Sequence, residues 1–114
     1  MKRLIILLAT FCVIAVFAGC ADKPPSVRVT NQRANKANVQ FKQSNGNTIN
    51  HNDVQPGTSS NYQDVVTGII DVKAEMQNEP DLAEKSFVAT DNTNYTIVIL
   101  AGDPPTIRID QQSK

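Results

Sequence analysis

The sequence predicts an all-β domain built as an antiparallel sandwich of two sheets with seven or eight strands. After Ser26, short segments rich in Val, Ile, Thr, Phe and Tyr alternate with clusters of Asn, Asp, Gly and Pro. The first set of residue types favours strands and the second favours turns. No segment shows an amphipathic helix of useful length, and turn signals recur roughly every ten residues, which is typical of a sandwich.

The individual strands follow from the same pattern, taken in chain order. Each predicted strand is an apolar or alternating segment that ends at a turn cluster. The segment 79–85 is expected to be either one helical turn or a loop. Strands are predicted at 26–30, 38–42, 47–50, 61–65, 69–76, 85–90, 94–101 and 106–110.

Two patterns indicate where strands lie within a sheet. Residues 70–76 alternate strictly between apolar and charged side chains, so one face of that strand is expected to be buried and the other wet. Residues 95–100 are apolar on both faces after Thr96, which favours the middle of a sheet, whereas 106–110 alternate and are expected nearer an edge. The two prolines in 103–105 predict a turn between these strands, because proline cannot donate to a ladder.

The amino-terminal segment has the features of a secretory signal. Lys2 and Arg3 precede an uncharged apolar run from Leu4 to Ala18, whose 15 residues fall short of the roughly 20 that span a bilayer as a helix. A basic start, a short apolar run and small residues at its end are the parts of a cleavable signal. We expect everything after this segment to lie outside the cytoplasm.

The residues Phe-Ala-Gly-Cys that end at Cys20 resemble the lipobox of bacterial lipoproteins. Phe17 stands where Leu, Val or Ile is usual. The resemblance implies that lipid is attached to the thiol of Cys20 and that the chain is cut just before it. The alternatives are an ordinary signal peptide with a chance cysteine, or an uncleaved anchor.

This cut would divide the chain into three parts. Residues 1–19 are then the lipoprotein signal peptide, 20–25 the lipidated cysteine with a polar tether, and 26–114 the sandwich. Because Cys12 leaves with the signal, the mature chain keeps one thiol, the lipidated one. That excludes an internal disulfide, thiol-ligated metals and cysteine nucleophiles from the mature protein, so its core must suffice for stability.

Charge does not indicate a partner. Removing Lys2 and Arg3 from the 11 basic residues leaves nine against 11 acidic ones, a formal charge of −2. The charges are scattered singly, with no basic stripe to hold a phosphate backbone. A nucleic-acid partner is therefore not expected.

His51 is the only histidine and falls in a polar region, where it is interpreted as a solvated turn residue. One histidine cannot form a metal cluster alone. The alternative is a general base acting on a hydroxyl of Thr58, Ser59 or Ser60, although the spacing does not place these groups together. We expect no enzymatic activity, since no nucleophile and base stand at a recognisable spacing.

The carboxylates also favour plain interpretations. Asp71 and Glu75 would share one strand face about 13 Å apart, with Lys73 between them. That exceeds the roughly 9.5 Å limit for paired glycosidase carboxylates, so a solvated face is expected. Residues 91–94, Asp-Asn-Thr-Asn, offer oxygen ligands but lack the glycine and glutamate of the best-defined calcium loop, which favours a hairpin turn. We expect no metal and no cofactor.

Single glycines and aromatic residues complete the candidates. Gly46 and Gly57 are expected in turns, where a left-handed backbone explains them. Without any tryptophan, the aromatic residues are expected to belong to the core and not to a sugar platform. These residues are Phe41, Tyr62, Phe87 and Tyr95.

Five strand-and-turn segments run in the order seen in a bacterial envelope family catalogued as a domain of unknown function. They are 27–31, 37–41, 57–62, 68–72 and 94–98. Members of that family look like immunoglobulin-like sandwiches on exported proteins and lipoproteins, and the resemblance covers nearly the whole mature chain. It implies a role in cell-surface or exopolysaccharide assembly. Residues 32–36 lack the Pro-Asp pair that often fills the family's first turn.

These observations favour a lipoprotein that acts as a non-enzymatic binding or structural module in the cell envelope or on the cell surface. Its expected partners are the membrane, through lipid on Cys20, and an envelope protein or polysaccharide. The alternative is a periplasmic inhibitor of a lysozyme-type hydrolase, although the inhibitors of this size used for comparison carry a disulfide. Ala21, in place of Asp after the cysteine, favours the outer membrane if the host is Gram-negative.

Overall fold

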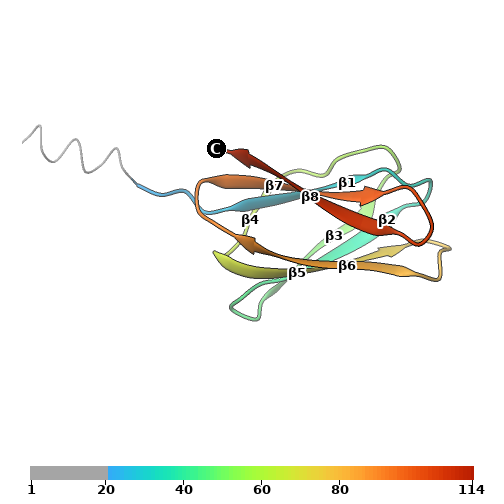
Figure 1. Cartoon of the computed structure of the whole chain (residues 1–114), viewed down its shortest axis with the longest axis horizontal. Coiled ribbons are helices and arrows are strands. Elements are labelled where there is room, and N and C mark those ends of the chain that lie inside the picture. The colour runs from blue at the N-terminus through green and yellow to red at the C-terminus, as the bar shows by residue number, and fades with distance from the viewer. Residues whose placement is uncertain (1–20) are drawn as a thin grey trace, which may run out of the picture.

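The computed structural model describes residues 21–114, which form a sandwich of two four-stranded sheets (Figure 1). The predicted all-β sandwich is confirmed, with eight strands and no helix among these residues. The strands are β1 (Ser26–Asn31), β2 (Ala37–Lys42), β3 (Thr48–Val54), β4 (Gln63–Asp64), β5 (Gly68–Met76), β6 (Leu82–Ala89), β7 (Thr93–Leu100) and β8 (Thr106–Ser113).

The strand order defines which strands are central. Sheet A runs β4-β1-β7-β8, and sheet B runs β3-β2-β5-β6. The named strands pair antiparallel except for β1 and β7, which run parallel. β7 therefore lies in the middle of sheet A and β8 at its edge, as their apolar patterns predicted.

Strand boundaries differ from the predicted ones where the side chains are polar. β3 continues to Val54 instead of ending at residue 50, and β8 continues to Ser113 instead of 110. β4 has only two residues, and β6 begins at Leu82. The segment 79–85 is therefore a loop up to residue 81, as one of the two alternatives predicted, and strand from there on. Hydrogen bonding to a neighbouring strand decides where these strands begin and end. The order of apolar residues in the sequence gives little sign of it.

The hydrophobic core lies between the inner faces of the two sheets. Alternate residues of β2 and β5 point inward and are buried, while their neighbours are exposed. No buried side-chain nitrogen or oxygen within residues 21–114 lacks a hydrogen-bond partner. The largest fully buried apolar side chains are Tyr95, Phe41, Ile70, Met76, Ile97 and Ile99.

Tyr95 has a polar end that must be satisfied inside this core. Its hydroxyl oxygen accepts a hydrogen bond from the backbone N–H of Thr90 at 2.9 Å, and its O–H points to the carbonyl of Val88 at 3.4 Å. A tyrosine that bonds the backbone a few residues upstream is a recurring corner in immunoglobulin-like sandwiches. It fixes the connection between β6 and β7.

One end of the sandwich, the proximal pole, holds the start of the described chain and its carboxyl end (Figure 1). Lys23 exchanges backbone and side-chain hydrogen bonds with Asn92, at 2.8 and 2.9 Å, and Pro25 is buried. The Lys114 ammonium donates to the carbonyl of Pro24. Residues 23–25 of the expected tether therefore form backbone hydrogen bonds to the domain.

The opposite end, the distal pole, is joined by one ion pair. The Arg33 guanidinium is bidentate to the Glu79 carboxylate, and the two side chains are only 12% and 17% exposed. Arg33 also donates to the carbonyls of Leu100 and Gly102, each at 2.8 Å. Three loops, 32–36, 77–81 and 101–105, are thus connected through a single side chain.

The hydrogen bonds from Arg33 hold the pKa of Glu79 below its ordinary value of 4.5. A carboxylate whose pKa is lowered on folding contributes stability above its unfolded pKa, and this contribution is lost as the pH falls through the folded pKa. The distal pole is therefore weakened in acid.

We expect Glu79→Ala to lower the free energy of unfolding at neutral pH by about 1–3 kcal/mol, because Arg33 would keep its charge in a largely buried place without a carboxylate partner. The neutral variant Glu79→Gln should also be less stable than wild type, but the gap should shrink in acid. Urea unfolding at neutral pH and well below pH 4.5 measures this gap. An equal gap at both pH values would contradict the ion-pair account.

Candidate functional site

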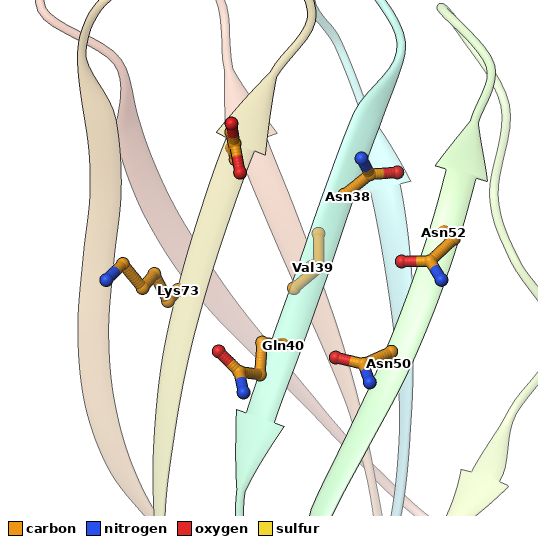
Figure 2. Close-up of a pocket in the computed structure, with 7 residues that line it drawn as sticks. Asn38, Val39, Gln40, Asn50, Asn52 and Lys73 are labelled. Carbon is orange, nitrogen blue, oxygen red and sulfur yellow. The ribbon is translucent and has the colours of Figure 1, made fainter.

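The outer face of sheet B carries four exposed carboxamide side chains, here called the amide face. They are Asn38 and Gln40 on β2, and Asn50 and Asn52 on β3. They stand out from two neighbouring strands with Lys73 of β5 beside them (Figure 2). They line a shallow hollow of about 430 Å³ together with Val39, Lys73 and Glu75.

The register between strands sets this arrangement. Gln40 lies opposite Asn50 on one side and Lys73 on the other, and Asn38 lies opposite Glu75. Because every second residue of a strand points to the same face, β2 and β3 each place alternate polar side chains on the outer face of sheet B. Along β2, the residues of the amide face therefore alternate with residues of the core.

A β-bulge shapes one end of the hollow. The pairing of β2 with β3 shifts between Ala37 and Val39, so that two residues of β3 oppose Asn38. Asp53 has a φ of 55°, and its N–H donates to Oδ1 of Asn38 at 2.8 Å. The bulge therefore fixes the Asn38 side chain and leaves its amide NH₂ group directed away from that bond.

The other three carboxamides make no side-chain hydrogen bond to another residue in the described part of the chain. Each can both donate and accept in the plane of its amide group. Such groups match a ligand that carries many neutral hydroxyl groups, since every hydroxyl also donates and accepts. The face lacks an exposed aromatic or large apolar side chain at its centre, which a typical protein interface would bury.

The charged residues beside the amide face lie as the sequence predicted. Asp71, Lys73 and Glu75 all point outward from β5 and are exposed. Lys73 forms a long ion pair with Glu84 at 3.8 Å, and Asp71 accepts a hydrogen bond from Ser86. Since opposite charges neighbour one another, this side of the hollow favours no strongly charged ligand.

The interpretation of His51 as a solvated turn residue is wrong. It lies within β3, half-buried, and packs edge-to-face on Phe41 with ring centroids 5.3 Å apart. Its Nδ1 is 2.9 Å from Oγ of Ser60, and its Nε2 is 3.1 Å from Oε1 of Gln63. The polar sequence around His51 concealed its inward position on an edge strand.

The structure thus brings His51 to one of the three hydroxyls considered for a general base, Ser60, which sequence spacing did not place beside it. A hydroxyl bonded to an imidazole is the first requirement of a nucleophile and base pair. Here the same Ser60 oxygen accepts the backbone N–H of Val29 at 2.9 Å. We interpret these hydrogen bonds as structural contacts that hold β3 of sheet B against β4 and β1 of sheet A.

A second inward polar residue, Lys85, stands at the opposite side of the sandwich. It lies on edge strand β6 opposite the buried Val72, so its stem points toward the core. Its ammonium reaches the carbonyl of Ile107 on β8 at 3.5 Å. Inward charges on edge strands oppose pairing with other chains.

The remaining candidates have structural roles. Residues 91–94 form a turn with the start of β7, and Asn92 has a φ of 63°. The predicted hairpin is wrong, because this turn leads from β6 in sheet B to β7 in sheet A. Gly46 and Gly57 have positive φ values of 87° and 73°, as expected for turns. Among residues 21–114, no three potential His, Cys, Asp or Glu ligands gather at one place.

The core prediction holds for three aromatic residues and fails for the fourth. Phe41 and Tyr95 are buried, and Phe87 packs against the core. Tyr62 is instead 37% exposed, with the Arg28 guanidinium 4.6 Å from its ring centroid. It precedes the two-residue strand β4, where pairing is too short to carry it inward.

The amide face cannot be recognised from the sequence alone. The signal was present as polar residues at every second position of two adjacent predicted strands, but their cross-strand register is a tertiary property. Cys20 lies outside the described residues, so its lipidation stays a prediction. Residues 21–114 contain no helix long and apolar enough to cross a membrane.

No protein-family model matches the chain, and no curated protein matches it with significant similarity. The resemblance to the envelope family therefore stays a prediction.

Proposed function

We propose that this chain is a lipid-anchored lipoprotein of the bacterial envelope that binds neutral, hydroxyl-rich polysaccharide on its amide face. The observation that carries the proposal is the set of exposed carboxamides on β2 and β3 around one hollow. The domain acts as a binding module without catalysis. Its anchor is lipid on Cys20, attached through the lipobox-like residues that end there.

The proximal pole supports this arrangement of anchor and binding face. Asn92 donates through its side-chain amide to Asp22 at 3.2 Å, and Lys23 is bonded to the domain. Cys20 therefore precedes the first docked residue by only two positions, which keeps the lipid close to this pole. The strands run from pole to pole, so the amide face lies along the side of the domain, open to a polymer beside the membrane (Figure 1).

The proposed destination is the outer membrane in a Gram-negative host, because Ala21 follows the cysteine where Asp would retain the protein at the inner membrane. The mature chain has no second thiol with which to form an internal disulfide. Stability must then come from the core and the bonds at its edges and poles.

Changing Cys20 to Ser should leave the precursor uncut and without lipid, because the thiol is the atom that lipid would modify. The measurement is labelling with a radioactive fatty acid, followed by separation of precursor and mature forms by size. Normal mature protein from Cys20→Ser, together with unlabelled wild type, would show that the chain is not a lipoprotein.

We expect the wild-type protein to be retarded in native gels that contain envelope or capsular polysaccharide. The double variant Gln40→Ala/Asn50→Ala should bind at least about tenfold more weakly, because two hydrogen-bonding carboxamides are lost. Gln32→Ala is a matched control, since it removes an exposed carboxamide from a loop at the distal pole, away from the amide face.

Retardation that the double variant retains in full would place the ligand on another surface. A wild-type protein that passes every polysaccharide gel unretarded, yet slows a muramidase at a stoichiometric ratio, would instead support the inhibitor alternative.

A further inference from the structure

The edge strand β8 carries a feature that the amide face does not use. Within the described chain, β8 pairs with β7 on one side only, over eight residue pairs from Thr93–Ser113 to Leu100–Thr106. Its other side presents backbone donors and acceptors along the edge of sheet A. Such an edge is a template for a further strand.

Two hydrogen bonds reveal which residues face outward. The carbonyl of Ile99 accepts the N–H of Gln32. The backbone N–H and C=O groups of the odd-numbered residues of β7 therefore point to β1, and those of the even-numbered residues point to β8. In the observed register, Val98 lies opposite Arg108. The even residues of β8 are therefore bonded to β7, and Ile107, Ile109 and Gln111 direct their backbone groups away from the sheet. The Lys85 ammonium at the Ile107 carbonyl agrees with this assignment.

We propose that β8 pairs antiparallel with β8 of a second copy of this chain, centred on Ile109. In that register Arg108 of each copy lies opposite Asp110 of the other, and Ile107 lies opposite Gln111. Within one copy, Arg108 and Asp110 form an ion pair with each other at 2.9 and 3.1 Å, and their side chains are 53% and 48% exposed. The dimer would exchange these two pairs within the chains for two pairs between them. Opposite charges placed directly across two strands stabilise their pairing.

The charges also select this register over its neighbours. Centring the pair on Arg108 would bring two guanidinium groups together, and centring it on Asp110 would bring two carboxylates together. Only the Ile109 centre both matches outward backbone groups and pairs unlike charges. The Lys85 ammonium does not block it, because a carbonyl oxygen can accept two hydrogen bonds.

The dimer is independent of the ligand of the amide face, because that face belongs to sheet B and β8 to sheet A. Two copies would carry two amide faces, which raises the effective affinity for a repetitive polymer. Anchoring both copies in one membrane would favour the pairing further by concentrating them.

The test is sedimentation equilibrium of the full chain in detergent at matched micelle density. We expect a reversible dimer for wild type, and at least about tenfold weaker association for Arg108→Asp and for Asp110→Arg, since each places like charges opposite one another. An equimolar mixture of the two variants should dimerise again, because each strand of one sign then faces a strand of the other.

A second variant tests the backbone pairing. Gln111→Pro removes an outward N–H that the chain's own sheet does not use, so the monomer should stay folded by circular dichroism while dimerisation weakens. A wild type that stays monomeric at its highest soluble concentration would overturn the proposal. So would single charge variants that associate as strongly as wild type, or a mixture that associates no better than its components.

Discussion

The strict alternation of side chains along β2 and β5 is the constraint on which both the core and the candidate site depend. Phe41 and Val72 point inward and pack against sheet A, while their neighbours in sequence, Gln40 and Lys73, point outward. A slip of one residue in either strand would bury the polar set and expose the apolar one. Burial of the apolar set is therefore what holds the carboxamides on the outer face.

A sandwich of two sheets has open sides and ends, and this mature chain has no cysteine pair with which to close them. His51 joins the edges on one side and Lys85 reaches across on the other. Arg33 connects three loops at the distal pole, and Asn92 holds the incoming chain at the proximal pole. These polar contacts leave the outer face of sheet B free, and of them only the Lys85 bond to the Ile107 carbonyl touches the edge of β8.

The sequence predicted the fold class, the approximate place of each strand and the central place of β7, because these follow largely from local residue patterns. Prediction failed where tertiary pairing overrides composition. His51 sits among polar neighbours yet points inward, and Tyr62 is aromatic yet stays exposed beside Arg28. The amide face was not foreseen, because it depends on which strands become neighbours, and that is decided by the whole sheet.

The most direct test of the proposed site is an NMR titration of nitrogen-labelled protein with oligosaccharides from envelope polysaccharide. The side-chain NH₂ groups of Asn38, Gln40, Asn50 and Asn52 give their own signals, so the amide face can be observed without any substitution. The account predicts that these signals shift together and saturably, while that of Gln32 stays in place. Shifts confined to the distal loops, or no shifts at all, would contradict it.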